Sequence, residues 1–70
     1  METIYDIQQY LKKFGTLIYV GDRVADLELM EAEVKELYHA KLMDIRDYQM
    51  AILLLRQEIQ SIKEERKISH

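Results

Sequence analysis

Apolar residues recur at intervals of three and four along most of this chain, the spacing that places them on one face of an α-helix. The pattern predicts helices over residues 4–14, 23–40 and 45–62, with a core on their apolar faces. Three amphipathic helices joined by short links predict an all-α fold, a small three-helix bundle. The residues expected in its core are Ile4, Ile7, Leu11, Phe14, Leu27, Met30, Val34, Leu37, Tyr38, Leu42, Ile45, Tyr48, Ala51, Ile52, Leu55, Ile59 and Ile62.

Capping residues stand where the pattern begins and ends. Thr3 with Asp6 three residues later resembles a capping box, and Asp44 with Asp47 repeats that spacing before the third helix. Asp22 is expected to cap the second helix. The bundle is expected to occupy residues 1–62, followed by a charged, frayed tail over residues 63–70.

The first two helices are joined by an apolar stretch between the two glycines of the chain, Gly15 and Gly21. Its residues, Thr16-Leu17-Ile18-Tyr19-Val20, favour a β-strand, but no second strand is predicted with which they could pair. We name residues 16–20 the connector. Its apolar character predicts an irregular segment or a short helical turn that plugs one end of the bundle and fixes the angle between the first two helices.

Composition narrows the class of protein. Seventy residues make a single small domain, which buries about 60% of the surface its unfolded chain exposes. No cysteine is present, no apolar run reaches the ~20 residues that span a bilayer, and no secretory signal is visible at the start. A cytoplasmic protein without membrane contact is therefore expected. The net charge of −3 is concentrated in the second helix, since six of the acidic residues lie between positions 22 and 36.

Signatures of an enzyme are missing from the sequence. No serine, threonine or cysteine stands in a recognisable nucleophile motif, and the glycines do not form a phosphate-binding loop. Glu36 and His39 make a Glu-x-x-His step, but di-iron bundles need two such steps and two more carboxylates. We therefore expect no catalytic activity, no metal, no cofactor and no small-molecule substrate.

Aromatic and basic residues close to the connector suggest nucleic-acid binding. Single-stranded DNA or RNA is held by rings that stack on bases and cations that follow the phosphates. The candidate residues for such a surface are Lys12, Lys13, Tyr19 and Arg23. The alternative for each is structural. Tyr19, like Tyr5 and Tyr10, packs at the edge of the core, the lysines form a solvated face, and Arg23 forms a local ion pair with Asp22 or Asp26.

A protein-interaction or self-association module is the second hypothesis. Leu53 and Leu54 widen the apolar face of the third helix beyond what a three-helix core requires. The acidic face of the second helix could attract a basic partner.

Several short motifs resemble the YqgQ family of short bacterial cytoplasmic proteins. They are Tyr5-Asp6-Ile7-Gln8-Gln9, Phe14-Gly15-Thr16-Leu17-Ile18-Tyr19-Val20-Gly21-Asp22-Arg23, Leu29-Met30-Glu31, Glu36-Leu37-Tyr38 and the run from Tyr48 to Glu58. The resemblance covers residues 4–58. It implies a three-helix fold and single-stranded nucleic-acid binding, and it carries no motif of established function.

Overall fold

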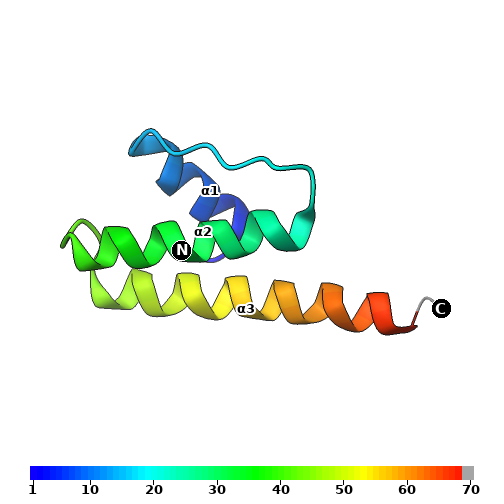
Figure 1. The fold of residues 1–70 in the computed structure, drawn as a ribbon. Coiled ribbons are helices and arrows are strands. Elements are labelled where there is room, and N and C mark those ends of the chain that lie inside the picture. The colour runs from blue at the N-terminus through cyan, green and yellow to red at the C-terminus, as the bar shows by residue number, and fades with distance from the viewer. Residues whose placement is uncertain (69–70) are drawn as a thin grey trace.

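The computed structural model describes residues 1–68, with side chains described up to residue 66. It contains three helices, α1 (Ile4–Lys13), α2 (Arg23–His39) and α3 (Ile45–Ile68), and no strand within the described residues. The all-α three-helix bundle predicted from the periodicity is therefore confirmed. Figure 1 shows α2 and α3 lying alongside each other, with α1 and the connector on the opposite side of α2 from most of α3 in this view.

Side chains from all three helices meet in one core. Ile7 and Leu11 come from α1, and the other members come from α2, α3 and the link between them. The buried cluster is Ile7, Leu11, Leu27, Met30, Val34, Leu37, Met43, Ala51 and Leu55. All of these except Met43 were expected from the periodicity.

The helices begin at the capping residues that the sequence indicated. The Thr3 hydroxyl accepts a hydrogen bond from the Asp6 N–H (3.2 Å), and the Asp6 carboxylate accepts one from the Thr3 N–H (3.2 Å), which completes a capping box. Asp22 accepts from Ala25 N–H at 2.9 Å. Asp44 accepts from Asp47 N–H at 2.7 Å. Each bond satisfies a backbone donor that the first turn of a helix leaves free.

α1 ends in a Schellman motif. The Thr16 N–H donates to the Leu11 carbonyl (3.1 Å) and the Gly15 N–H donates to the Lys12 carbonyl (3.0 Å). Gly15 has a φ of +80°, the left-handed conformation that this ending requires.

α2 ends with the same pair of hydrogen bonds but without a glycine. The Leu42 N–H donates to the Leu37 carbonyl (2.9 Å), and the Lys41 N–H donates to the Tyr38 carbonyl (3.0 Å). Lys41 takes the left-handed position, with a φ of 63°. This turn buries Met43 and leaves Leu42 half exposed, so the prediction that Leu42 faces the core is wrong by one residue.

Three further expectations for apolar residues are corrected. Phe14 is 42% exposed, because it lies at the C-cap of α1, where it contacts the Tyr10 ring. Ile45 is exposed as well. The connector does not plug the bundle: Leu17, Tyr19 and Val20 are exposed. Of its apolar residues, Ile18 is the one that packs against the core.

α3 continues beyond the expected boundary at residue 62 and reaches Ile68. Its 24 residues correspond to a length of about 36 Å at 1.5 Å per residue, so it extends past α2 (Figure 1). Arg66, near its end, forms an ion pair with Asp22 (3.0 Å). Residues 69–70 of the expected frayed tail lie outside the described residues.

Two leucines on α3 provide a matched test of the core. Leu55 is fully buried and Leu53 is about half exposed, yet both changes to alanine alter helix propensity equally. Leu55→Ala should cost about 2–5 kcal/mol. That is comparable to the whole stability of about 3–5 kcal/mol that a core of this size supplies. Leu53→Ala should change stability by less than about 0.5 kcal/mol. Urea denaturation followed by circular dichroism measures both, and equal losses would show that the buried face is misassigned.

Candidate functional site

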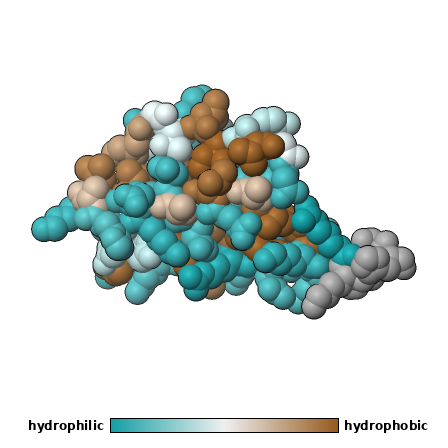
Figure 2. Space-filling model, viewed as in Figure 1, coloured by the Kyte–Doolittle hydropathy of each residue, from teal (hydrophilic) through white to brown (hydrophobic). Residues whose placement is uncertain are grey.

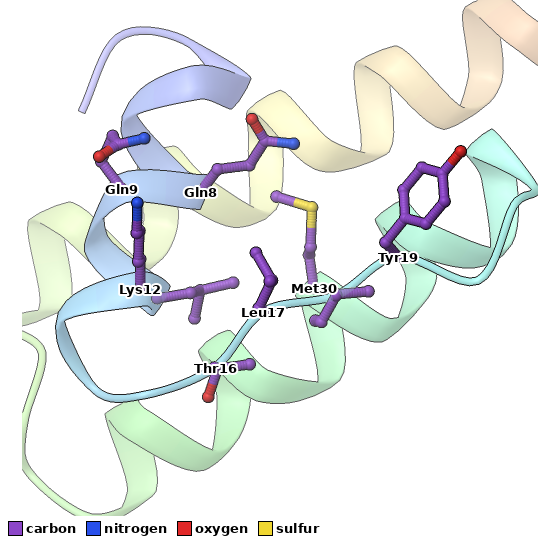
Figure 3. A pocket seen from close by; sticks show the side chains of 9 residues that line it. Gln8, Gln9, Lys12, Thr16, Leu17, Tyr19 and Met30 are labelled. Atoms are coloured by element: carbon purple, nitrogen blue, oxygen red, sulfur yellow. The ribbon is translucent and has the colours of Figure 1, made fainter.

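A groove of about 400 Å³ lies between α1 and the connector (Figure 3). We call it the α1–connector groove. It is lined from α1 by Gln8, Gln9, Leu11 and Lys12, from the connector by Thr16, Leu17, Ile18 and Tyr19, and from α2 by Met30. Its volume falls within the range of small-ligand sites.

The groove combines an apolar base with a polar rim. Leu11 and Met30 are members of the buried core, and Ile18 packs against that core. Gln8, Gln9 and Lys12 are exposed on α1, on one wall of the groove. Tyr19 is 84% exposed and stands on the opposite side (Figure 3). The rim therefore offers amide donors and acceptors, a cation and an aromatic ring.

The position of the connector is fixed by contacts at both ends and in the middle. At its start, Thr16 N–H donates to the last turn of α1 through the Leu11 carbonyl. At its end, Val20 N–H donates to the Asp26 carboxylate at 2.7 Å. Between them, Ile18 packs against the core. The groove thus depends on α1 and on the first turns of α2 together.

The four candidate residues from the sequence fall into two groups. Lys12 and Tyr19 line the groove. Lys13 and Arg23 are exposed and do not line it, since Lys13 ends α1 and Arg23 begins α2. The alternative ion pair between Arg23 and a neighbouring carboxylate does not form among the described residues, where Asp22 pairs with Arg66 and Asp26 accepts from the connector.

Gln8 and Gln9 are groove residues that the sequence analysis placed only in a family motif. A usable signal was present in their spacing from Lys12. Residues three and four apart share a helix face, so Gln8 and Gln9 both neighbour Lys12 on α1. They lie off the apolar stripe that periodicity detects, and therefore no core argument singles them out.

The charge around the groove differs from that of the whole chain. No carboxylate from the described residues lines the groove, although the chain as a whole is acidic. Asp22 lies past the end of the connector. Its pKa is lowered, first by the hydrogen bond from Ala25 N–H and then by the Arg66 guanidinium. Lys12 therefore gives the lining of the groove a positive charge.

Tyr10 anchors α1 to the turn between α2 and α3. Its hydroxyl donates to the Leu42 carbonyl at 2.5 Å. Partial burial, followed by the negative charges of Asp47 and Asp44, raises the pKa of Tyr10. Core-edge packing was expected for Tyr5, Tyr10 and Tyr19, and it is confirmed for Tyr10 alone, because Tyr5 and Tyr19 are largely exposed.

The surfaces considered for protein interaction or self-association, on α3 and on the acidic face of α2, are smaller than the sequence suggested. Leu54 packs partly against the core, which leaves Leu53 as the exposed member of that pair. On the acidic face of α2, Glu31 is paired with Lys35 (3.4 Å) and with Arg56 (3.3 Å).

The described part of the chain shows neither a metal-binding cluster nor a membrane-spanning helix. Within residues 1–68, no group of three or more His, Cys, Asp or Glu side chains is arranged to hold a metal ion. No helix in the same range combines the length and the apolar content needed to cross a bilayer.

The fold and the groove define a small all-α domain of three helices that carries a ligand-sized groove beside its first helix. The chain belongs to the YqgQ-like family, whose family model matches residues 1–61. It is 41% identical over 66 residues to the Bacillus subtilis (strain 168) protein described as "Uncharacterized protein YqgQ". That alignment covers 94% of this chain and 93% of the relative. The family resemblance drawn from the motifs is thereby confirmed.

The lowered pKa of Asp22 predicts a specific acid sensitivity. A carboxylate whose pKa is lower in the folded state stabilises the fold above its unfolded pKa of about 3.9 and loses that contribution as the pH falls through the folded value. Asp22→Asn retains a capping side chain but cannot titrate. The variant should be less stable than the parent at neutral pH, and its stability should fall less steeply below about pH 5.

Urea denaturation at a series of pH values measures this difference. Glu28→Gln is the matched control, because Glu28 is an exposed carboxylate on the same helix without a hydrogen bond or ion pair to the described residues. Parallel stability profiles for Asp22→Asn and the parent would contradict the assignment. Asp6, whose pKa is lowered chiefly by the hydrogen bond from Glu2 N–H, still titrates in both proteins.

Proposed function

We propose that this protein is a non-enzymatic cytoplasmic module that binds single-stranded nucleic acid weakly through the α1–connector groove. The observation that supports the proposal most directly is the composition of the groove: an apolar base, an amide and lysine wall, and an exposed tyrosine. A nucleobase has apolar faces and hydrogen-bonding edges, and it is joined to a phosphate. Each part finds a chemically matched group in the groove.

Each group has a distinct role in this proposal. The Tyr19 ring stacks on a base, which the 84% exposure of its side chain permits. The Gln8 and Gln9 amides meet base edges, since an amide can both donate and accept. Lys12 contacts the backbone phosphate. Lys13 and Arg23, outside the groove, supply positive charge along the path of the strand.

A single strand fits this site better than a duplex. The bases of a duplex are stacked and paired, so their faces are not available to Tyr19. The chain also has a net charge of −3, whereas proteins that grip duplex DNA through its phosphates usually carry a basic excess. The low number of cations near the groove implies weak binding with a shallow dependence on salt.

Fluorescence anisotropy with labelled single-stranded DNA and RNA oligonucleotides of about 10 nucleotides tests the proposal. Affinity should fall as salt rises, with an unlabelled duplex competing poorly. Lys12→Ala should weaken binding and reduce the salt slope by about 0.7. Lys63→Ala is the control: it removes the same charge from an exposed position on α3, outside the groove, and should change neither quantity appreciably.

Tyr19→Ala provides the second arm of the experiment. Loss of one stacked base should cost about 1–3 kcal/mol of binding free energy with little change in the salt slope. Tyr5→Ala is its control, because Tyr5 is also an exposed tyrosine but does not line the groove. Absence of binding at low salt, or equal effects of the test and control variants, would refute the proposed function.

A further inference from the structure

The connector has the chemical features of a sheet edge that lacks its neighbour. Figure 1 shows it as an extended segment running outside the helices. Neither the N–H nor the C=O of Leu17, Ile18 or Tyr19 forms a hydrogen bond with another described residue. A row of unpaired backbone groups is a template for pairing with another extended chain. The residue types present, Thr, Ile, Tyr and Val, are those enriched in strands.

Side chains of residues 16–19 alternate in the manner of a strand, and Val20, at the end of the connector, is exposed as well. Thr16 and Ile18 are partly buried, whereas Leu17 and Tyr19 are 85% and 84% exposed. No other exposed large hydrophobic side chain among the described residues has so high an exposed fraction. Figure 2 shows hydrophobic surface gathered over the region of α1 and the connector. The monomer therefore leaves two large side chains, on one face of an extended segment, in water.

We propose that two copies of this chain associate by antiparallel pairing of their connectors about a two-fold axis at Ile18. In that register Leu17 of each copy lies directly across from Tyr19 of the other, and Thr16 lies across from Val20. The two most exposed apolar side chains then cover each other as aliphatic–aromatic cross-strand pairs. Backbone groups of successive residues point to opposite edges of a strand, so the second copy supplies hydrogen-bond partners to alternate residues of each connector.

Charge favours the antiparallel arrangement. Lys12 and Lys13 precede the connector. Asp22, Arg23 and Asp26 follow it, and Asp22 also pairs with Arg66, so the positive excess lies at the start of the connector. Antiparallel pairing places the two lysine pairs at opposite ends of the paired segment, each near the aspartates of the other copy. A parallel pair in register would instead bring the lysines of both copies together, which is repulsive.

The connector also lacks the features that prevent edge pairing. Charged residues and prolines commonly protect exposed edges, and residues 16–20 contain neither. A contact centred on five residues per copy is small beside the roughly 1,200–2,000 Å² of a standard stable interface. The dimer is therefore expected to be weak and to dissociate on dilution. This inference goes beyond the proposed function and needs no nucleic acid.

Sedimentation equilibrium of the pure protein from about 10 μM to about 1 mM measures the association. The parent should shift toward dimer across this range. Tyr19→Lys places a charge at the paired edge and should abolish the shift. Leu53→Lys makes a similar change at an exposed apolar position on α3 and should leave it intact. The proposal is overturned if the parent stays monomeric over this range, even if its connector binds a different protein. Equal loss of dimer in Tyr19→Lys and Leu53→Lys would also overturn it.

Disulfide trapping tests the register. The chain contains no cysteine, so Leu17→Cys and Tyr19→Cys each introduce a single thiol. The two variants are mixed and oxidised, with one of them isotope-labelled for mass spectrometry. The proposed pairing places the thiol at position 17 of one copy directly opposite the thiol at position 19 of the other, at about 4.5–5.5 Å between Cβ atoms. Disulfide-linked dimers that contain one copy of each variant should form a larger fraction of all linked dimers than random collision would give. Mixed dimers at or below that share would overturn the proposed pairing, even if the protein is dimeric.

Discussion

Burial of Ile7 and Leu11 holds the first helix to the rest of the molecule, and the groove and the connector both depend on it. A helix of 10 residues is unstable by itself in water, so α1 persists because these two side chains enter the shared core. One wall of the groove is the exposed face of that helix. The start of the connector is fixed to its last turn. Detachment of α1 would remove the wall and release the connector together.

The helices could be predicted from the sequence because each buries a face with a regular period. The caps at Thr3, Asp22 and Asp44 could also be predicted, since each places an acceptor next to free backbone donors.

The periodic pattern failed where the chain leaves the helix. It assigned Phe14 and Leu42 to the core. Phe14 is the C-cap of α1, where helical geometry ends, and Leu42 follows the left-handed Lys41, which changes the direction of the next side chains. The connector was misjudged for a different reason. Its hydrophobic composition suggested burial, but burial in an extended segment depends on which face meets the bundle, and alternate residues face opposite ways. The groove, likewise, depends on how the connector folds back beside α1, which is a long-range outcome that local spacing does not encode.

Tyr19 belongs both to the groove and to the outer face of the connector. Occupation of one surface therefore alters the availability of the other, and the two binding equilibria are linked by mass action. If the pairing of two connectors covers the ring, high protein concentration disfavours stacking on a base. An oligonucleotide that captures the ring would in turn favour the monomer. Such reciprocity follows from a shared residue and requires no change of fold.

The two helix endings show how a distant contact can override a local preference. α1 and α2 finish with the same pair of hydrogen bonds, yet one uses Gly15 and the other Lys41 in the left-handed conformation. For a residue with a Cβ this conformation costs roughly 1–2 kcal/mol. The turn at Lys41 orients the Leu42 carbonyl toward Tyr10 and carries Met43 into the core. The link between the two long helices therefore stores strain, and side chains elsewhere in the molecule keep it from relaxing.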